Sequence, residues 1–425
     1  MIYTVKSGDT LFKIAREYGV TIESIVEANG LSRPNDLVIG QSLFIPTQSN
    51  LTTYRVVAGD TMYLISQRLG IPLNDLIVAN PQITNPNVIN IGDIINIPSG
   101  KKAIEVNGYA IANINTTTLE RTLPYLTYIS IFSYQAKQDG NLFILYEDDI
   151  IERARNMSVA PVMVVTNIAE NGGFDSDIAS RILNNENITN TLINNIISRV
   201  VDKNYYGVDI DFEYLYPRDR VAYLNFLRKL KTELVKINKK LSVAVAPKYR
   251  DEQSGILYEA HDYRGIGEIA DRVIIMTYEW GYTYGEPMAV SPLMEVDAVL
   301  RYAVTRIPPE KILMGMPNYG YAWNIPYEQG TPATAITNSR ALELAIENGA
   351  TINFDERAQA PYFNYTGDNG RNKVVWFDDA RSISARLELV NKYNLAGVSY
   401  WTINNFYAVN WAVLNSKFDV VKINY

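Results

Sequence analysis

The chain has 425 residues, 47% hydrophobic and 20% charged, which is ordinary for a folded globular protein with room for two or three domains. It has no cysteine and one histidine, His261, a composition that excludes disulfides, thiolate metal sites and most zinc sites. The net charge of −7 argues against nucleic acid and anionic membranes as partners, and no apolar run reaches the ~18 residues of a membrane span. We interpret His261 as a structural residue on a helix or loop surface.

The N-terminal 100 residues contain an internal repeat, in which residues 3–46 align with residues 54–98. Residues 8–10 and 59–61 both read Gly-Asp-Thr, a turn followed by a helix cap. Each copy predicts the order strand, helix, helix, strand. This unit resembles the LysM domain, which binds the N-acetylglucosamine chains of peptidoglycan and chitin. The resemblance implies LysM domains at residues 1–47 and 53–99, and the polar segments 47–53 and 99–102 predict short linkers.

After residue 104, short apolar segments that predict strands alternate with amphipathic segments that predict helices, such as residues 189–202 and 220–239. Eight such units predict an α/β fold, a (β/α)8 TIM barrel over residues 104–425. About 60 residues after the seventh strand contain strand-like pieces of their own. They predict an α+β subdomain inserted at about 318–375. The predicted strands are 105–111, 128–132, 161–165, 207–213, 241–246, 272–278, 312–316 and 397–401.

The most informative segment, residues 206–213, reads Tyr-Gly-Val-Asp-Ile-Asp-Phe-Glu. Asp209, Asp211 and Glu213 stand two residues apart on the fourth predicted strand, so their carboxylates leave the same face. Crowding like charges in a partly desolvated place raises at least one pKa, which lets a carboxylic acid keep its proton near neutral pH. The segment therefore predicts a catalytic acid cluster.

Two alternatives explain this segment less well. The solvated face of an edge strand is a common reason for alternating acids. Here, however, the flanking positions 205, 206, 214 and 216 are all tyrosines rather than charged residues. A calcium loop of the EF-hand type needs Gly at its sixth position and Glu at its twelfth, where this chain has Tyr214 and Arg220.

The position of the acids in the predicted barrel supports the same interpretation. In TIM barrels the chemistry lies at the C-terminal ends of the strands. Glu213 ends the fourth predicted strand, Tyr278 and Glu279 end the sixth, and Trp401 ends the eighth. We therefore expect these side chains to lie around one active site.

Four motifs in the correct order resemble glycoside hydrolase family 18, the chitinase-like barrels. Residues 206–213 resemble the family motif Asp-Gly-x-Asp-x-Asp-x-Glu, and residues 276–280 (Met-Thr-Tyr-Glu-Trp) resemble its Met-x-Tyr-Asp segment. Residues 315–320 resemble the end of strand seven. Residues 397–401 resemble strand eight with its floor tryptophan. The similarity extends over residues 105–425.

This resemblance implies a retaining, substrate-assisted mechanism, which differs from the usual two-carboxylate scheme. Glu213 would act as general acid and then as general base. Asp211 would orient the 2-acetamido group of the sugar and stabilise the oxazolinium ion, Asp209 would share a proton with Asp211, and Tyr278 would hydrogen-bond the acetamido group. The implied substrate contacts are Trp401, stacked beneath the sugar ring, with Glu279, Met276, Asn318, Tyr319 and Tyr109.

The chain departs from the family pattern at two positions. Tyr206 replaces the first Asp of the motif, which we expect to remove one acid from the hydrogen-bond chain beneath the site. Glu279 replaces an Asp, so its carboxylate reaches further into the pocket.

LysM repeats in front of such a barrel look like the spore peptidoglycan hydrolases of endospore-forming bacteria, above all the cortical fragment-lytic N-acetylglucosaminidases. This implies cleavage after N-acetylglucosamine in cortex fragments during germination, by a monomer that needs no metal or cofactor. The N-terminus lacks the basic and apolar segments of a signal peptide, so we expect a spore location reached without secretion. Two alternatives remain: a chitinase, or a carbohydrate-binding protein with an inactive barrel, a type that usually lacks the acid at position 213.

Overall fold

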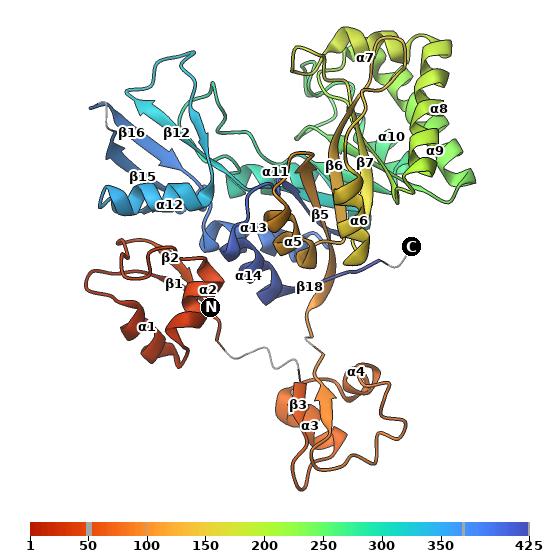
Figure 1. The fold of residues 1–425 in the computed structure, drawn as a ribbon. Helices are drawn as coiled ribbons and strands as arrows, with labels where there is room; N and C mark the ends of the chain where they lie inside the picture. Colours follow the sequence, from red (N-terminus) through yellow and green to blue (C-terminus); the bar gives the residue numbers. More distant parts are fainter. Residues whose placement is uncertain (48–52, 99, 368–369, 424–425) are drawn as a thin grey trace.

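The computed structural model describes residues 1–47, 53–98, 100–367 and 370–423. It contains two small N-terminal domains, a barrel and an inserted sheet (Figure 1). Residues 48–52 of the first predicted linker and residue 99 of the second lie outside the described residues. Within the described ranges, no helix is long and apolar enough to cross a membrane.

Both N-terminal domains have the predicted order of elements. The helix caps lie where the repeat places them, because Thr10 and Thr61 accept backbone hydrogen bonds at the helix starts. Gly19 and Gly70 end these helices in the left-handed conformation. The first domain contains β1 (Ile2–Thr4), α1 (Leu11–Tyr18), α2 (Ile22–Asn29) and β2 (Ser42–Phe44). The second contains β3 (Thr53–Arg55), α3 (Met62–Leu69), α4 (Leu73–Val78) and β4 (Ile94–Asn96).

Eight parallel strands form the barrel, and β17 closes it by pairing with β5. All eight predicted strands are present, and β18 (Phe418–Val420) extends the sheet along β5. In order around the barrel the strands are β5 (Lys102–Ile111), β6 (Tyr128–Gln135), β7 (Ala160–Thr166), β8 (Gly207–Asp211), β9 (Lys240–Val245), β10 (Arg272–Ile275), β11 (Ile312–Pro317) and β17 (Gly397–Trp401).

Two strands are shorter than predicted, which corrects where the site residues lie. Strand β8 ends at Asp211, so Glu213 follows the strand rather than ending it. Strand β10 ends at Ile275, and Tyr278 and Glu279 lie in the segment after it. There the backbone turns locally, with the N–H of Tyr278 donating to the carbonyl of Met276, instead of continuing the ladder. Residues 212–213 of the acidic motif and residues 276–279 after β10 therefore lie in loop segments at the C-terminal end of the barrel.

Helices surround the barrel and bury one face each against it (Figure 1). Helices α8 and α9 confirm the predicted helices at 189–202 and 220–239, although α9 ends three residues earlier, at Lys236. The helices are α5 (Thr116–Thr122), α6 (Asp148–Asn156), α7 (Ser176–Leu183), α8 (Glu186–Asp202), α9 (Arg220–Lys236), α10 (Tyr263–Ile269), α11 (Leu293–Ala303), α13 (Ala380–Lys392) and α14 (Ala408–Lys417). Three short 3-10 helices lie at Leu123–Tyr125, Pro217–Asp219 and Pro309–Lys311.

The insertion predicted after the seventh strand is a five-stranded antiparallel sheet in the order β13-β12-β16-β15-β14. Helix α12 packs on it through Ala341 and Ala345, which contribute to the same core as Phe363 and Val375. Its elements are β12 (Gly320–Ile325), β13 (Thr334–Ile336), α12 (Asn338–Glu347), β14 (Asn353–Asp355), β15 (Ala360–Thr366) and β16 (Asn372–Trp376).

The first N-terminal domain packs against the rest of the chain. The backbone N–H of Ile352, in the insertion, donates to the carbonyl of Ile39 at 2.9 Å. Gly40 has a φ of +83°, and a Cβ there would lie 1.8 Å from the Ile352 carbonyl oxygen, so only glycine fits. Phe44 joins the barrel core, and helix α2 packs on α14. This domain is therefore docked onto both the barrel and the insertion.

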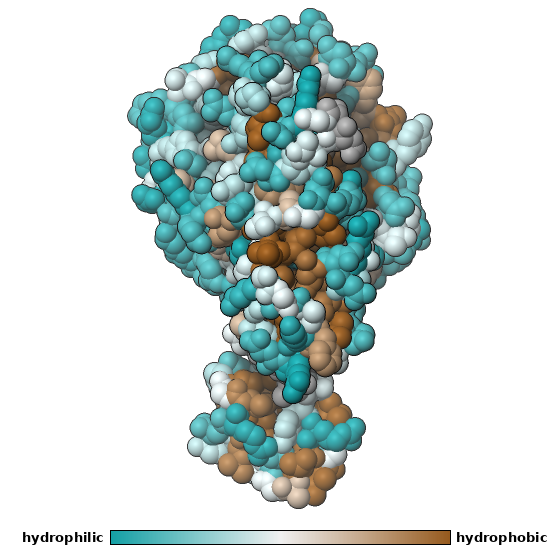
Figure 2. Space-filling model, turned by 90° about the vertical axis from the view of Figure 1, so that its left-hand side faces the viewer, coloured by the Kyte–Doolittle hydropathy of each residue, from teal (hydrophilic) through white to brown (hydrophobic). Residues whose placement is uncertain are grey.

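The second N-terminal domain lacks these docking side chains. In the repeat, Asn96 stands where the first domain has Phe44, and Asn90 stands where it has Val38, which joins the core of the insertion. Figure 2 shows this domain as a separate lobe below the barrel, with apolar side chains among the polar ones on its surface. Its exposed large apolar side chains are Val57, Tyr63, Leu64, Val78, Val88, Ile91 and Ile94.

Candidate active site

A cavity of about 630 Å³ opens at the C-terminal ends of the barrel strands. Its walls come from residues within the barrel strands and from the segments that follow them, which are far apart in sequence but adjacent in the closed barrel. Seven of the ten predicted site residues line it: Tyr109, Asp211, Glu213, Met276, Tyr278, Glu279 and Trp401. The barrel thus brings most of the predicted constellation into one place.

Two acids of the cluster face this cavity with raised pKa values. Asp211 is buried, its Oδ1 has no hydrogen-bond partner, and burial together with the charges of Glu213 and Asp209 raises its pKa well above the usual range. Glu213 lies at the cavity wall, where burial and the charge of Glu279 raise its pKa to about 7. The predicted rise in pKa is present, and it leaves Glu213 able to hold a proton near neutral pH. In the described part of the chain, no three His, Asp or Glu side chains are grouped as metal ligands.

The third acid, Asp209, lies beneath the cavity rather than in its wall. The Tyr109 hydroxyl donates to its Oδ2 and the Ser242 hydroxyl to its Oδ1, each at 2.6 Å. Burial raises the pKa of Asp209, while these two hydroxyls lower it. Each carboxylate oxygen of Asp209 thus accepts a hydrogen bond from a hydroxyl group, and the sharing of a proton between Asp209 and Asp211 stays a prediction. Asp209 acts on Asp211 through its charge.

Aromatic rings form the floor of the cavity. The ring centroid of Trp401 lies 4.8 Å from that of Phe132 and 5.5 Å from that of Tyr109, both in edge-to-face contact. These contacts hold the indole in place and leave it partly exposed toward the cavity. A flat, fixed apolar surface of this kind suits a sugar ring.

Two predicted substrate contacts lie outside the cavity wall. The Asn318 amide donates to the backbone carbonyls of Thr402 and Asn405, at 2.9 and 2.8 Å, and so ties the end of β11 to the segment after β17. Tyr319 donates its hydroxyl to Glu279, as does Tyr321 at 3.1 Å. As a correction, we assign Asn318 a structural role, and Tyr319 holds the Glu279 carboxylate instead of lining the pocket.

Besides Phe132 of the floor, four aromatic residues of the cavity are absent from the prediction: Phe174, Tyr214, Tyr258 and Tyr282. They come from the segments after β7, β8, β9 and β10, and the rings of Phe174 and Tyr214 lie 6.3 Å apart. Of these four, only Tyr214 could have been found from the sequence, because it is one of the tyrosines that flank the acidic motif. Its place in the pocket depends on the loop conformation, which the sequence does not reveal.

Two further expectations concern Tyr206 and His261. Tyr206 precedes β8 at the opposite end of the barrel, where its ring lies 5.6 Å from Tyr128 and lines a separate cavity of about 230 Å³. Ser242, a hydrogen-bond partner of Asp209, lines the same cavity, so the expectation that Tyr206 removes an acid beneath the site stays a prediction. His261, which we expected on a helix or loop surface, is buried, and its ring contacts the backbone of Ala246 and Phe212.

The comparisons with known proteins agree with this geometry. Residues 108–405 match the model of glycosyl hydrolases family 18, and residues 3–46 and 54–98 each match the LysM domain. Over 99% of both sequences, the chain is 39% identical to the cortical fragment-lytic enzyme of Bacillus subtilis (strain 168). The crystal structure of the spore cortex-lytic enzyme SleL of Bacillus megaterium QM B1551 superposes with a TM-score of 0.85 at 39% identity, covering 100% of this chain and 99% of that one. A chitinase from Chromobacterium violaceum ATCC 12472 has a TM-score of 0.69 at 25% identity, covering 74% of this chain and 99% of the chitinase.

Proposed function

The chain belongs to glycosyl hydrolase family 18, and we propose that it hydrolyses spore cortex peptidoglycan by cleaving the glycosidic bond after N-acetylglucosamine. The observation that carries the proposal is the pair of Glu213 and Asp211 in one cavity above an aromatic floor, with the pKa of Glu213 raised to about 7. Similarity over almost the full length to cortical fragment-lytic enzymes supports the choice of polymer and an association with the spore.

In the proposed mechanism no side chain of the protein attacks the sugar. Glu213 protonates the leaving glycosidic oxygen while the carbonyl oxygen of the 2-acetamido group attacks the anomeric carbon. Asp211 accepts the acetamido N–H with its unpartnered Oδ1 and stabilises the positive oxazolinium ion. Tyr278, at the cavity wall, donates to the acetamido oxygen. Glu213 then deprotonates the water that opens the ring.

A second candidate function is hydrolysis of chitin, which the similarity to the Chromobacterium chitinase favours. Both polymers offer N-acetylglucosamine on the glycone side of the cut, so the mechanism alone does not distinguish them. Digestion of purified cortex fragments and of chitin oligomers, followed by mass spectrometry of the new reducing ends, tests the choice. We expect cortex products that end in N-acetylglucosamine. Products from chitin alone would contradict the proposal.

The activity should depend on pH through Glu213. Since the acid must carry its proton, and its pKa is raised to about 7 rather than left near 4.5, activity is retained below that pH and lost above it. We expect kcat/KM on a soluble N-acetylglucosamine oligomer to fall about tenfold per pH unit beyond about pH 7. A pH–rate profile measures this. If kcat/KM already begins to fall near pH 4.5, the pKa of Glu213 is not raised and the prediction is wrong.

We further propose that the LysM domains attach the enzyme to the cortex, with the second domain as the independent anchor. Phe44 of the first domain contributes to the barrel core, so deleting both domains would expose the apolar residues that it contacts. Excision of residues 54–98 alone is therefore the cleaner test. Thr53 and Asn96 are paired across β3 and β4, so the first and last strands of this domain lie side by side. We expect weaker retention on insoluble cortex in a sedimentation assay and unchanged kcat/KM on soluble fragments. Equal losses in both assays would contradict this division of roles.

A further inference from the structure

The backbone around Glu213 has left the barrel sheet. Strand β8 pairs with β7 as far as Asp211 and with β9 as far as Ile210, so residues 212–214 continue without a neighbouring strand. Tyr214 has a φ of 55°, in the left-handed region, so the chain turns sharply just after the acid. Something other than the strand ladder must therefore hold the backbone from which the Glu213 carboxyl projects.

The side chain of Asn167 takes the place of a neighbouring strand at Glu213 itself. Its Oδ1 accepts the Glu213 backbone N–H, and its Nδ2 donates to the Glu213 backbone carbonyl, both at 2.9 Å. Asn167 follows directly after β7 and is fully buried. Its Nδ2 also donates to the carbonyl of Asp175 at 3.0 Å, which fixes the orientation of the amide.

His261 holds the adjacent residue from the other side of the strand. Its Nδ1 accepts the backbone N–H of Ala246 at 3.0 Å, so the proton of the neutral ring lies on Nε2. Nε2 then donates to the Phe212 carbonyl at 2.9 Å. The ring is 1% exposed, and burial lowers its pKa to about 4, so it stays in this form at neutral pH.

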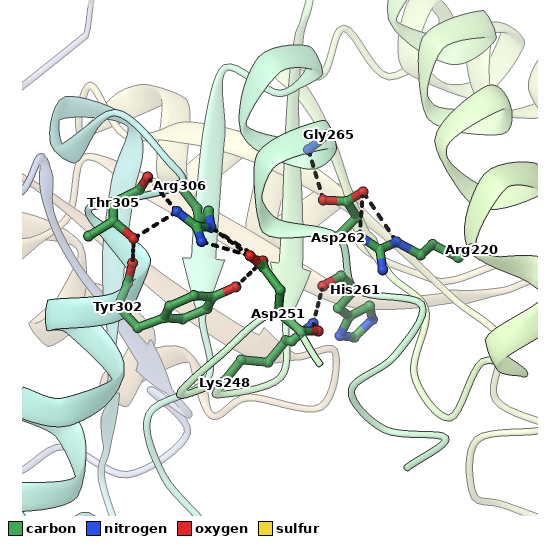
Figure 3. A network of polar contacts seen from close by, with 9 residues as sticks. All are labelled: Arg220, Lys248, Asp251, His261, Asp262, Gly265, Tyr302, Thr305 and Arg306. Atoms are coloured by element: carbon green, nitrogen blue, oxygen red, sulfur yellow. Dashed lines mark hydrogen bonds and ion pairs between the residues drawn. The ribbon is translucent and has the colours of Figure 1, made fainter. Parts of the chain in front are cut away.

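The loop that carries His261 is itself anchored, as Figure 3 shows. The Lys248 ammonium donates to the backbone carbonyls of His261 and Asp251, both at 3.2 Å. The Asp251 carboxylate pairs with Arg306 at 2.7 Å. Asp262, the residue after His261, pairs with Arg220 at 2.9 Å and caps α10. Through these contacts the loop after β9 is fixed to α9 and to the end of α11.

We propose that Asn167 and His261 are positioning residues that set the reach of the Glu213 carboxyl toward the glycosidic oxygen. This inference rests on the proposed function, because it assigns to Glu213 the role of proton donor. Neither side chain lines the cavity, so neither acts on the substrate directly. Loss of either contact lets the backbone at residues 212–213 shift, and a misplacement of ~1 Å can cost ~100-fold in rate.

A purely structural role is the alternative, and the chain contains a matched case. In the second LysM domain, Asn80 makes the same pair of bonds to a backbone segment, accepting the N–H of Asn96 at 2.7 Å and donating to its carbonyl at 2.8 Å. Asn80 is also buried. Asn80→Ala therefore removes the same kind of clamp at a place remote from the cavity, and it is the control for fold stability alone.

The test compares two substrates with the same N-acetylglucosamine oligomer and different leaving groups, a sugar and 4-nitrophenol. Nitrophenolate departs with little help from an acid, whereas a sugar alkoxide needs the proton of Glu213. In Asn167→Ala and His261→Phe, we expect kcat/KM on the sugar-leaving substrate to fall about 10–100-fold. On the nitrophenyl substrate we expect a loss at least several-fold smaller.

Further variants keep the test decisive if these two fold poorly. In His261→Gln the side-chain amide reaches about as far as Nε2 and restores the donor to Phe212, so it should recover most of the loss. Asn80→Ala should leave both rates unchanged. Equal losses on both substrates, in proportion to the fraction of folded protein measured by circular dichroism, would overturn the positioning role. If the full-length wild type hydrolyses neither substrate, the proposed function itself fails.

Discussion

Replacing Glu213 by Gln is expected to lower kcat/KM on oligosaccharides by about 10²–10⁴-fold, the usual contribution of a general acid. Glutamine keeps the size of the side chain and its place on the cavity wall but has no acidic proton to give. Sugar binding should survive, because the floor of Trp401 and the buried Asp211 are unchanged. Steady-state kinetics together with calorimetric titration of a short oligomer measures the two effects separately.

The same variant has a signature in stability that separates lost chemistry from a damaged fold. The pKa of Glu213 in the folded protein is raised to about 7 from about 4.5, so the native state holds a proton that the unfolded chain releases between these values. Its contribution is complete below the lower value and is lost as the pH rises through 7. Glutamine has no such dependence. We therefore expect the variant to melt at a higher temperature than the wild type above pH 7; a lower melting temperature throughout would indicate misfolding instead.

Replacing Asp211 by Asn should produce a loss of similar scale by a different route. The buried carboxylate stabilises the positive charge that develops on the oxazolinium ion, and asparagine cannot do so. Removal of one such electrostatic group typically costs about 10²–10³-fold in kcat. Because its Oδ1 has no hydrogen-bond partner within the protein, the substitution breaks no internal contact of that atom.

The leaving group distinguishes the two acids. The oxazolinium ion forms whichever group departs, so Asp211→Asn should lower kcat/KM on sugar-leaving and nitrophenyl substrates alike. Glu213→Gln should spare the nitrophenyl substrate, because that leaving group needs little protonation. Identical patterns in the two variants would mean that the roles of Asp211 and Glu213 are assigned wrongly.

Much of the architecture follows from local patterns in the sequence. The repeat in residues 3–46 and 54–98 determines two copies of one small domain, and the alternation of apolar strands with amphipathic helices determines the barrel. The motif of Asp209, Asp211 and Glu213 identifies the strand whose C-terminal end carries acids, and two of them, Asp211 and Glu213, line the cavity. Period and composition are properties of neighbouring residues, so these features are readable without the fold.

Local sequence patterns thus specify the elements and identify the acids, whereas the atoms that hold these acids are known only from the folded chain. Asp209 receives one of its two hydrogen bonds from Tyr109, 100 residues away. The hydrogen bonds to residues 212 and 213 come from His261 and Asn167, 49 and 46 residues away. The docking of the first LysM domain through Gly40 is a contact of the same long-range kind. Such contacts exist only once the barrel has closed, because closure brings the ends of distant strands together, and no local pattern encodes which loop side chain will reach which backbone group.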